Sequence, residues 1–341
     1  MARKRLPASY YIDGIKKGDR LVLSQAITLA ESTRPSDREL ASTIIEELMP
    51  LTGKAFRIGI TGVPGVGKST FIDAFGSFLT GQGNSVAVLA IDPSSQRSQG
   101  SILGDKTRMD QLAHDPKAYI RPSPTGGSLG GVAQKTRESL LLCEAAGYEV
   151  IIVETVGVGQ SEVTVHGMVD FFLLLMLPNA GDELQGIKKG IMEMADGLVI
   201  NKSDGEYEAA ARRAMVHYSQ ALRLFPIGGS GLRPKVISCS ALKGKNLNAV
   251  WENLQNYRDR TQENGYWQER RQSQAVEWLE ETLTHQLKEL FFKNPTVKEK
   301  LGTFRQMAAS GMHSPIHLGE QLVKEWHPDS SENSAKIAKD S

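Results

Sequence analysis

Residues 62–69 constrain the fold of this chain more than any other segment. They read Gly-Val-Pro-Gly-Val-Gly-Lys-Ser and match the pattern G-x-x-x-x-G-K-[ST] at every fixed position. Glycines let successive backbone N–H groups turn toward phosphate oxygens, the lysine reaches the β- and γ-phosphates, and the serine hydroxyl ligates Mg²⁺. An apolar run at 55–60 precedes the pattern and helical spacing follows at 69–79, so the sequence predicts strand, phosphate loop and helix in that order. The expected phosphate contacts are Gly62, Val63, Pro64, Gly65, Val66, Gly67, Lys68, Ser69 and Thr70.

A second motif predicts the base of the nucleotide. Residues 201–204 read Asn-Lys-Ser-Asp, follow the apolar run 197–200 and match the pattern N-K-x-D. A carboxylate only accepts hydrogen bonds, and guanine offers it two adjacent donors where adenine presents an acceptor at N1. We therefore expect Asp204 to select guanine, Lys202 to lie along the base and Asn201 to brace the loop. A further base-contacting loop is expected after the strand 235–237, at Ser238, Cys239, Ser240 and Ala241.

Carboxylates at strand ends predict the metal site. The β-branched run 150–153 leads into Glu154-Thr155-Val156-Gly157, an E-x-x-G sequence where many GTPases have D-x-x-G. Glu154 is expected to hold Mg²⁺ through water, and Gly157 to offer its N–H to the γ-phosphate. Asp92 ends the apolar run 86–91, and Asp105 lies in the polar loop that follows; the alternatives are a turn cap before a proline and a helix N-cap. The predicted metal ligands are Ser69, Asp92, Asp105 and Glu154, and the predicted catalytic groups are Lys68, Asp92, Asp105 and Glu154.

The order of the segments predicts the fold class. Strand-like and helix-like segments alternate between residue 55 and about residue 258, which is typical of an α/β protein with a mostly parallel sheet flanked by helices. The predicted organisation is an N-terminal helical extension (1–50), a P-loop domain (51–262), a C-terminal helical arm (263–329) and a disordered tail (330–341). The very apolar run 171–177 is too short to span a bilayer and predicts a buried strand.

The C-terminal arm carries one apolar stripe. Its residues recur at steps of 3, 4, 4 and 3, and Asn294-Pro295 then predicts the end of one helix and the start of another. Packing against the sheet and pairing with a second copy of the chain both explain such a stripe. Its members are Val276, Leu279, Leu283, Leu287 and Leu290.

Composition narrows the possible partners and compartments. The formal net charge is +1, so there is no electrostatic case for nucleic acid or a membrane surface. The two cysteines, Cys143 and Cys239, lie in or beside apolar segments and favour a reducing compartment without a disulfide framework. No apolar signal core follows the basic start, and we expect a cytoplasmic enzyme.

Several segments together resemble the MeaB family of P-loop GTPases. They are G-V-P-G-V-G-K-S-T, A-I-D-P-S-S, G-S-I-L-G-D-K-T-R-M, R-P-S-P-T-G-G-S-L-G-G, E-T-V-G-V-G-Q-S-E and N-K-S-D, and the resemblance spans residues 5–325. It implies a GTPase that accompanies methylmalonyl-CoA mutase, an adenosylcobalamin enzyme, and whose C-terminal arm forms a homodimer. It also implies phosphate and Mg²⁺ roles for Lys68, Ser69, Asp92, Asp105 and Glu154, and base recognition by Asn201, Lys202 and Asp204. Ser203 departs from the alanine common in the family.

Three functions compete on these observations. The first is a GTPase chaperone that gates adenosylcobalamin loading and protects the mutase. The second is a P-loop kinase of a periplasmic amino-acid-binding protein, the role suggested by the ArgK label of similar sequences; the guanine motif and the E-x-x-G sequence favour the first. The third is a nickel-insertion GTPase, which the scattered histidines and the missing C-x-x-C disfavour. Val158, and not glutamine, follows Gly157, so intrinsic turnover is expected to be slow.

Overall fold

The computed structural model describes residues 5–91, 109–122, 129–155, 161–179 and 189–326. The chain divides into two compact units, Met1–Ala275 and Val276–Ser341. The first unit holds the sheet and the predicted nucleotide site, and the second holds the greater part of the C-terminal helices.

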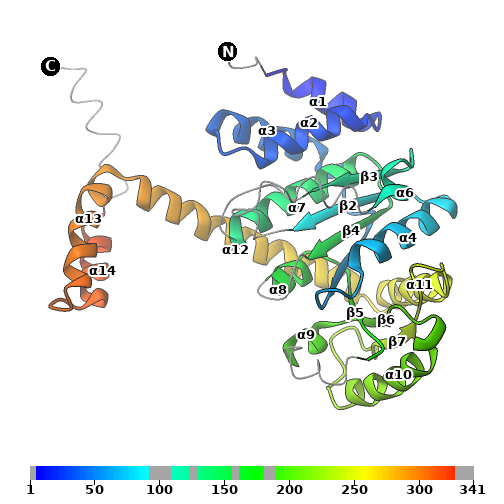
Figure 1. The fold of residues 1–341 in the computed structure, drawn as a ribbon. Coiled ribbons are helices and arrows are strands. Elements are labelled where there is room, and N and C mark those ends of the chain that lie inside the picture. Colours follow the sequence, from blue (N-terminus) through cyan, green and yellow to red (C-terminus); the bar gives the residue numbers. More distant parts are fainter. Residues whose placement is uncertain (1–4, 92–108, 123–128, 156–160, 180–188, 327–341) are drawn as a thin grey trace, which may run out of the picture. The chain divides into compact units, whose positions relative to one another are not determined.

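Seven parallel strands form the centre of the first unit, in the order β3-β2-β4-β1-β5-β6-β7 (Figure 1). The α/β fold with a parallel sheet is therefore confirmed. The short edge strand β3 was not predicted, because its four residues carry no apolar run. The strands are β1 (Phe56–Gly62), β2 (Val86–Ile91), β3 (Ala118–Arg121), β4 (Val150–Thr155), β5 (Phe171–Met176), β6 (Gly197–Ile200) and β7 (Lys235–Ser238).

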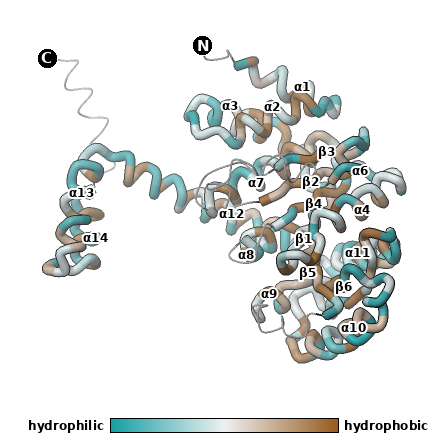
Figure 2. The backbone as a smooth tube through the Cα atoms, in the orientation of Figure 1, coloured by the Kyte–Doolittle hydropathy of each residue, from teal (hydrophilic) through white to brown (hydrophobic). Residues whose placement is uncertain are grey.

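Helices cover both faces of this sheet, which explains why its strands read as continuous apolar runs (Figure 2). On β5, Phe172 and Leu174 join the core on one face while Phe171 and Leu173 join the core on the other. The first core includes α1 (Ala8–Lys16), α2 (Arg20–Glu31), α3 (Pro35–Leu48), α7 (Leu129–Ala145) and α10 (Glu208–Arg223). The second includes α4 (Lys68–Gly81), α6 (Asp110–Ala113) and α11 (Leu247–Glu263). Shorter elements are η1 (Met49–Leu51), α8 (Ser161–His166), α9 (Lys189–Met194) and η3 (Gly205–Tyr207).

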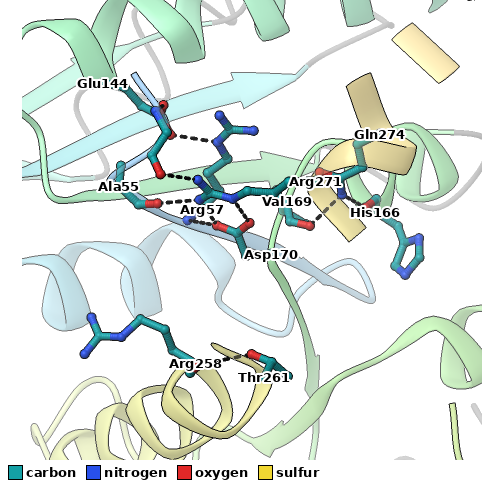
Figure 3. A network of polar contacts seen from close by, with 11 residues as sticks. Ala55, Arg57, Glu144, His166, Val169, Asp170, Arg258, Thr261, Arg271 and Gln274 are labelled. Carbon is teal, nitrogen blue, oxygen red and sulfur yellow. Dashed lines mark hydrogen bonds and ion pairs between the residues drawn. The ribbon is translucent and has the colours of Figure 1, made fainter. Parts of the chain in front are cut away.

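A buried polar network joins the amino ends of β1 and β5 to the start of α12 (Figure 3). Arg271 donates to both carboxylate oxygens of Asp170, each at 2.7 Å, and to the carbonyl oxygen of Ala55 at 2.6 Å. Asp170 also accepts from the backbone N–H of Arg57 at 2.8 Å, and the Arg57 side chain donates to Glu144 at 2.7 Å. Asp170 and Glu144 are buried, and each of these carboxylates has an arginine partner.

Three helices follow the nucleotide domain: α12 (Tyr266–Lys293), α13 (Pro295–Ala309) and α14 (Pro315–Lys324). The predicted break is confirmed, because the Asn294 side chain caps α13 by accepting from the N–H groups of Thr296 and Val297. The five apolar residues of the α12 stripe are each 50–63% exposed. No described helix has the length and apolarity needed to cross a bilayer.

Candidate nucleotide site

The phosphate loop runs from the carboxyl end of β1 to the first residue of α4. Two of its glycines are required by geometry. A Cβ on Gly62 would lie 2.5 Å from the carbonyl oxygen of Leu175, and Gly67 caps α4 in the left-handed conformation with φ 86°. The Val66 side chain is fully buried in the core, so this residue can face a ligand only through its backbone. The loop therefore presents backbone groups at a helix N-terminus, the arrangement that binds phosphate.

Lys68 lies across this loop. Its Nζ donates to the carbonyl oxygen of Gly62 at 2.8 Å. Burial lowers the pKa of Lys68, while the negative charges of Glu154 and Glu162 act in the opposite direction. The ammonium group thus has a neutral backbone partner at the place where phosphate oxygens would bind.

Two of the predicted metal ligands lie side by side. Parallel pairing of β1 with β4 sets Glu154 opposite Ile60, and the Ser69 hydroxyl donates to Oε1 of Glu154 at 3.4 Å. Both offer hard oxygen atoms, the ligand type that Mg²⁺ prefers. The other two, Asp92 and Asp105, lie outside the described residues, as does Gly157.

Asn201 connects the phosphate loop to the predicted base loops. Its Nδ2 donates to the carbonyl oxygen of Val66 at 2.9 Å, and its Oδ1 accepts from the backbone N–H of Ala241 at 3.2 Å. The next residue, Lys202, donates from Nζ to the carbonyl oxygen of Gly65 at 2.8 Å. Three segments that are far apart in the sequence therefore meet at one buried amide.

The two base loops are held together by backbone pairing that continues from β6 and β7. The N–H of Ser203 donates to the carbonyl oxygen of Cys239 at 2.9 Å, and the N–H of Cys239 donates to that of Ile200 at 2.8 Å. The Ser203 hydroxyl also donates to Ile200, so the serine that departs from the family pattern forms a local backbone contact. Asp204 is half-buried and precedes η3.

The remaining predicted phosphate and base contacts differ in their exposure. Pro64 and Thr70 are exposed, whereas the side chains of Cys239 and Ser240 are fully buried. Ser240 pairs with Lys245 through both backbone groups, which shapes the loop after Ser238. Cys239 and Ser240 could therefore contact a base only through their backbone.

Sequence reasoning assigned no role to Glu162, although it ends the segment E-T-V-G-V-G-Q-S-E. This carboxylate is fully buried in α8 and accepts from the Ser161 hydroxyl at 3.2 Å. Its charge partly offsets the lowering of the Lys68 pKa by burial. Its place in that segment was the available signal.

Comparison with known proteins finds similar sequences and a similar fold over most of this chain. Residues 23–296 match the family described as "Methylmalonyl Co-A mutase-associated GTPase MeaB". The chain is 48% identical over 276 residues to "GTPase ArgK" of Escherichia coli (strain K12), covering 80% of this chain and 83% of that protein. It is 45% identical over 321 residues to "Methylmalonic aciduria type A homolog, mitochondrial" of Mus musculus, covering 91% of this chain and 77% of that protein. A solved structure titled "Crystal structure of LAO/AO transport system kinase" is 36% identical with a TM-score of 0.74, covering 95% of this chain and 99% of that chain.

Proposed function

The chain belongs to the MeaB family of P-loop GTPases, and from this premise we propose that it hydrolyses GTP in order to gate adenosylcobalamin loading onto methylmalonyl-CoA mutase. The main observation in support of GTP binding and hydrolysis is the set of contacts that Asn201 makes. One side-chain amide binds both the phosphate loop and the loop that contains Ala241, which supports phosphate binding and base recognition at neighbouring positions.

The phosphate end of the proposed site depends on Lys68. In the structure the ammonium group donates to the neutral carbonyl of Gly62. A triphosphate would offer it a negatively charged acceptor, which forms a stronger hydrogen bond. Backbone N–H groups at the start of α4 would hold the remaining phosphate oxygens. The lysine then stabilises the negative charge on the transferred phosphoryl group as water attacks.

Mg²⁺ fits the oxygen atoms of Ser69 and Glu154, which already lie within hydrogen-bond distance. When bound there, the ion neutralises charge on the β- and γ-phosphates. Asp92 and Asp105 are proposed as further ligands on the family resemblance alone.

At the base end, Asp204 is proposed to accept hydrogen bonds from guanine. This proposal is supported by the backbone bond from Ser203 to Cys239, which holds the segment with half-buried Asp204 beside the loop that contains Ala241. Adenine has no donor at N1, so it would leave that carboxylate unpaired.

The partner is proposed from the family description, and the homodimer from the α12 stripe. Five aliphatic side chains on one face of a helix are each at least half exposed, which is unusual unless another surface covers them. A second copy of this helix offers the same stripe, and a homodimer would bury both.

The central test titrates the purified protein with purified methylmalonyl-CoA mutase in GDP and in a non-hydrolysable GTP analogue. Gating requires the affinity to differ between the two nucleotides, and linkage then requires mutase to change nucleotide affinity by the same factor. Equal affinities together with an unchanged GTPase rate would remove the gating proposal. Release of inorganic phosphate, in place of transfer to an acceptor protein, separates this proposal from a kinase.

The homodimer has a separate test. Leu283→Asp places a charge in the middle of the stripe and should give a monomer by sedimentation. Lys288→Asp is the control, because at about 100° per residue it lies on the opposite face of α12. Retention of the dimer in Leu283→Asp would show that the stripe is not the interface.

A further inference from the structure

A cavity of about 400 Å³ lies at the opposite edge of the sheet from the phosphate loop. Asp196, which directly precedes β6, and Pro234, which directly precedes β7, line it, so it opens at the amino ends of these strands. All of its lining residues belong to the first compact unit. Its volume is in the range of cavities that hold small molecules.

The Asp196 carboxylate, which lines this cavity, already has its hydrogen-bond partners. Asp196 accepts from the Tyr257 hydroxyl at 3.0 Å, from the N–H of Phe172 at 2.9 Å and from Nη1 of Arg270 at 3.1 Å. Three donors satisfy this carboxylate and leave it little capacity for a ligand. The charges of Arg270 and Asp196 also balance each other.

The buried unused group is a donor, and the exposed side chains of Glu193 and Arg233 also line the cavity. The Arg270 side chain is only 8% exposed, and its buried Nη2 has no acceptor among the described residues. No hydrogen bond within the described part of the chain uses the backbone N–H of Gly228 or Gly229, which line the same cavity. Gly228 and Gly229 are exposed, so the buried donor without an acceptor is Arg270 Nη2 alone. Such a donor is costly, and a ligand that brings an acceptor would be favoured here.

The glycine loop is held in place around the cavity. Asn264 donates from Nδ2 to the carbonyl oxygen of Ser230 at 2.9 Å. A Cβ on Gly229 would lie 2.8 Å from Cε2 of Tyr266, so only glycine allows this approach of the loop to α12. The loop therefore has a defined conformation with its backbone beside the cavity.

Part of the cavity wall is apolar. Met192, Leu222, Phe225 and Leu232 line the cavity, and half-exposed Ile227 lies among them. His166 also lines it and is neutral at pH 7, because burial and the nearby positive charge of Arg270 lower its pKa to about 4. A cavity with unused donors, balanced charges and partly apolar walls suits a ligand with one anionic head and a short apolar body.

We propose that this cavity is a second ligand site, separate from the nucleotide site, which binds small monocarboxylates through Arg270 and the Gly228–Gly229 backbone. The carboxylate supplies the missing acceptors, and the apolar chain lies against the Leu222 and Phe225 side of the cavity.

The test is calorimetric titration of the full-length protein with hexanoate. Two matched probes separate the contributions: hexanamide keeps the chain without the charge, and acetate keeps the charge without the chain. We expect saturable hexanoate binding with a Kd on the order of 0.1–1 mM and at least about tenfold weaker binding of both controls. Saturating GDP should leave hexanoate bound, because the two sites lie at opposite edges of the sheet.

Variants locate the site. Ile227→Trp should fill the cavity and weaken hexanoate at least about tenfold, whereas Leu224→Trp is the control, because Leu224 is exposed and does not line the cavity. Arg270→Lys keeps the charge and loses the planar fork, and should also weaken binding. Absence of saturable binding, equal binding of hexanoate and hexanamide, displacement by GDP, or full binding in Ile227→Trp would each overturn the proposal.

Discussion

Basic side chains at the two edges of the sheet have different partners. At the carboxyl edge, Lys68 and Lys202 donate to the neutral backbone carbonyls of Gly62 and Gly65. At the amino edge, Arg271 binds the buried carboxylate of Asp170, and Arg57 and Arg270 bind Glu144 and Asp196. A bond to a neutral carbonyl is weaker than one to a carboxylate, so the lysines are available to phosphate. Arg271, in contrast, uses Nε and both terminal nitrogens within the protein.

This difference indicates a division of labour within one sheet. Changes at the carboxyl edge should remove function and leave stability almost intact. Changes at the amino edge should lower stability, because they leave a buried charge without its partner. The predictions below test each half of that statement, beginning with the largest expected effect.

Lys68→Ala should reduce GTP turnover by about 10³-fold or more, because the charge that stabilises the transferred phosphoryl group is lost. The variant removes one hydrogen bond to a backbone carbonyl and a cation near Glu154 and Glu162, neither of which is bonded to Lys68 directly. The free energy of unfolding should therefore change by less than the roughly 3–5 kcal/mol expected for a broken buried ion pair. Phosphate release and urea unfolding measure the two quantities. Normal turnover would refute the assignment of this site.

Arg271→Met should lower the free energy of unfolding by about 3–5 kcal/mol, because buried Asp170 loses its cation and the carbonyl of Ala55 loses a donor. Urea unfolding with a double-mutant cycle against Asp170→Asn measures the effect, and the double variant should lose less than the sum of the single changes. The control is Arg212→Met, which removes an exposed ion pair with Glu208. This variant should lower the free energy of unfolding by less than about 0.5 kcal/mol. Equal effects of the two arginine changes would contradict the division of labour.

The two edges also differ in how well the sequence predicts them. The carboxyl edge can be predicted from local motifs, because the glycines and the lysine that bind a phosphate lie within eight successive residues. The strand, loop and helix around Lys68 could therefore be predicted, and so could the fold class. Pairing of Asn201 with Val66 follows only after the sheet order brings their loops together.

The amino edge has no such local signature. Arg271 and Asp170 are 101 residues apart, and Arg270 and Asp196 are 74 apart. An arginine in a helix and an aspartate before a strand are common, and only the packing of α12 against the sheet shows that they meet. The cavity is hidden from the sequence for the same reason.

Asp204→Asn tests the carboxyl edge for specificity. The amide places a donor where guanine presents its own donors, so GTP affinity should fall by about 10²-fold while XTP, with a carbonyl in place of the amine, becomes the preferred nucleotide. Competition binding measures the preference, and urea unfolding should show almost no change in stability. A retained preference for GTP would exclude Asp204 as the group that reads the base.

The smallest expected effect concerns His166 at the amino edge. Burial, and then the positive charge of Arg270 from α12, lower the pKa of His166 to about 4, while the negative charge of Asp196 acts in the opposite direction. The unfolded chain binds this proton near pH 6.5, so below that pH it holds more protons than the folded chain does. The stability that neutral His166 contributes is therefore complete above about pH 6.5 and is lost as the pH falls toward 4.

His166→Phe should remove this pH dependence. The ring of His166 contacts Phe172 edge-on, and a phenyl ring can keep that contact without titrating. Between pH 7 and pH 5 the wild-type protein should lose about 1–2 kcal/mol more unfolding free energy than the variant. Exposed His217→Gln is the control and should keep the wild-type slope. Urea unfolding at both pH values measures the difference; parallel losses in wild type and His166→Phe would mean that this imidazole protonates as easily in the folded chain as in the unfolded one, and that the amino edge does not exclude a further positive charge.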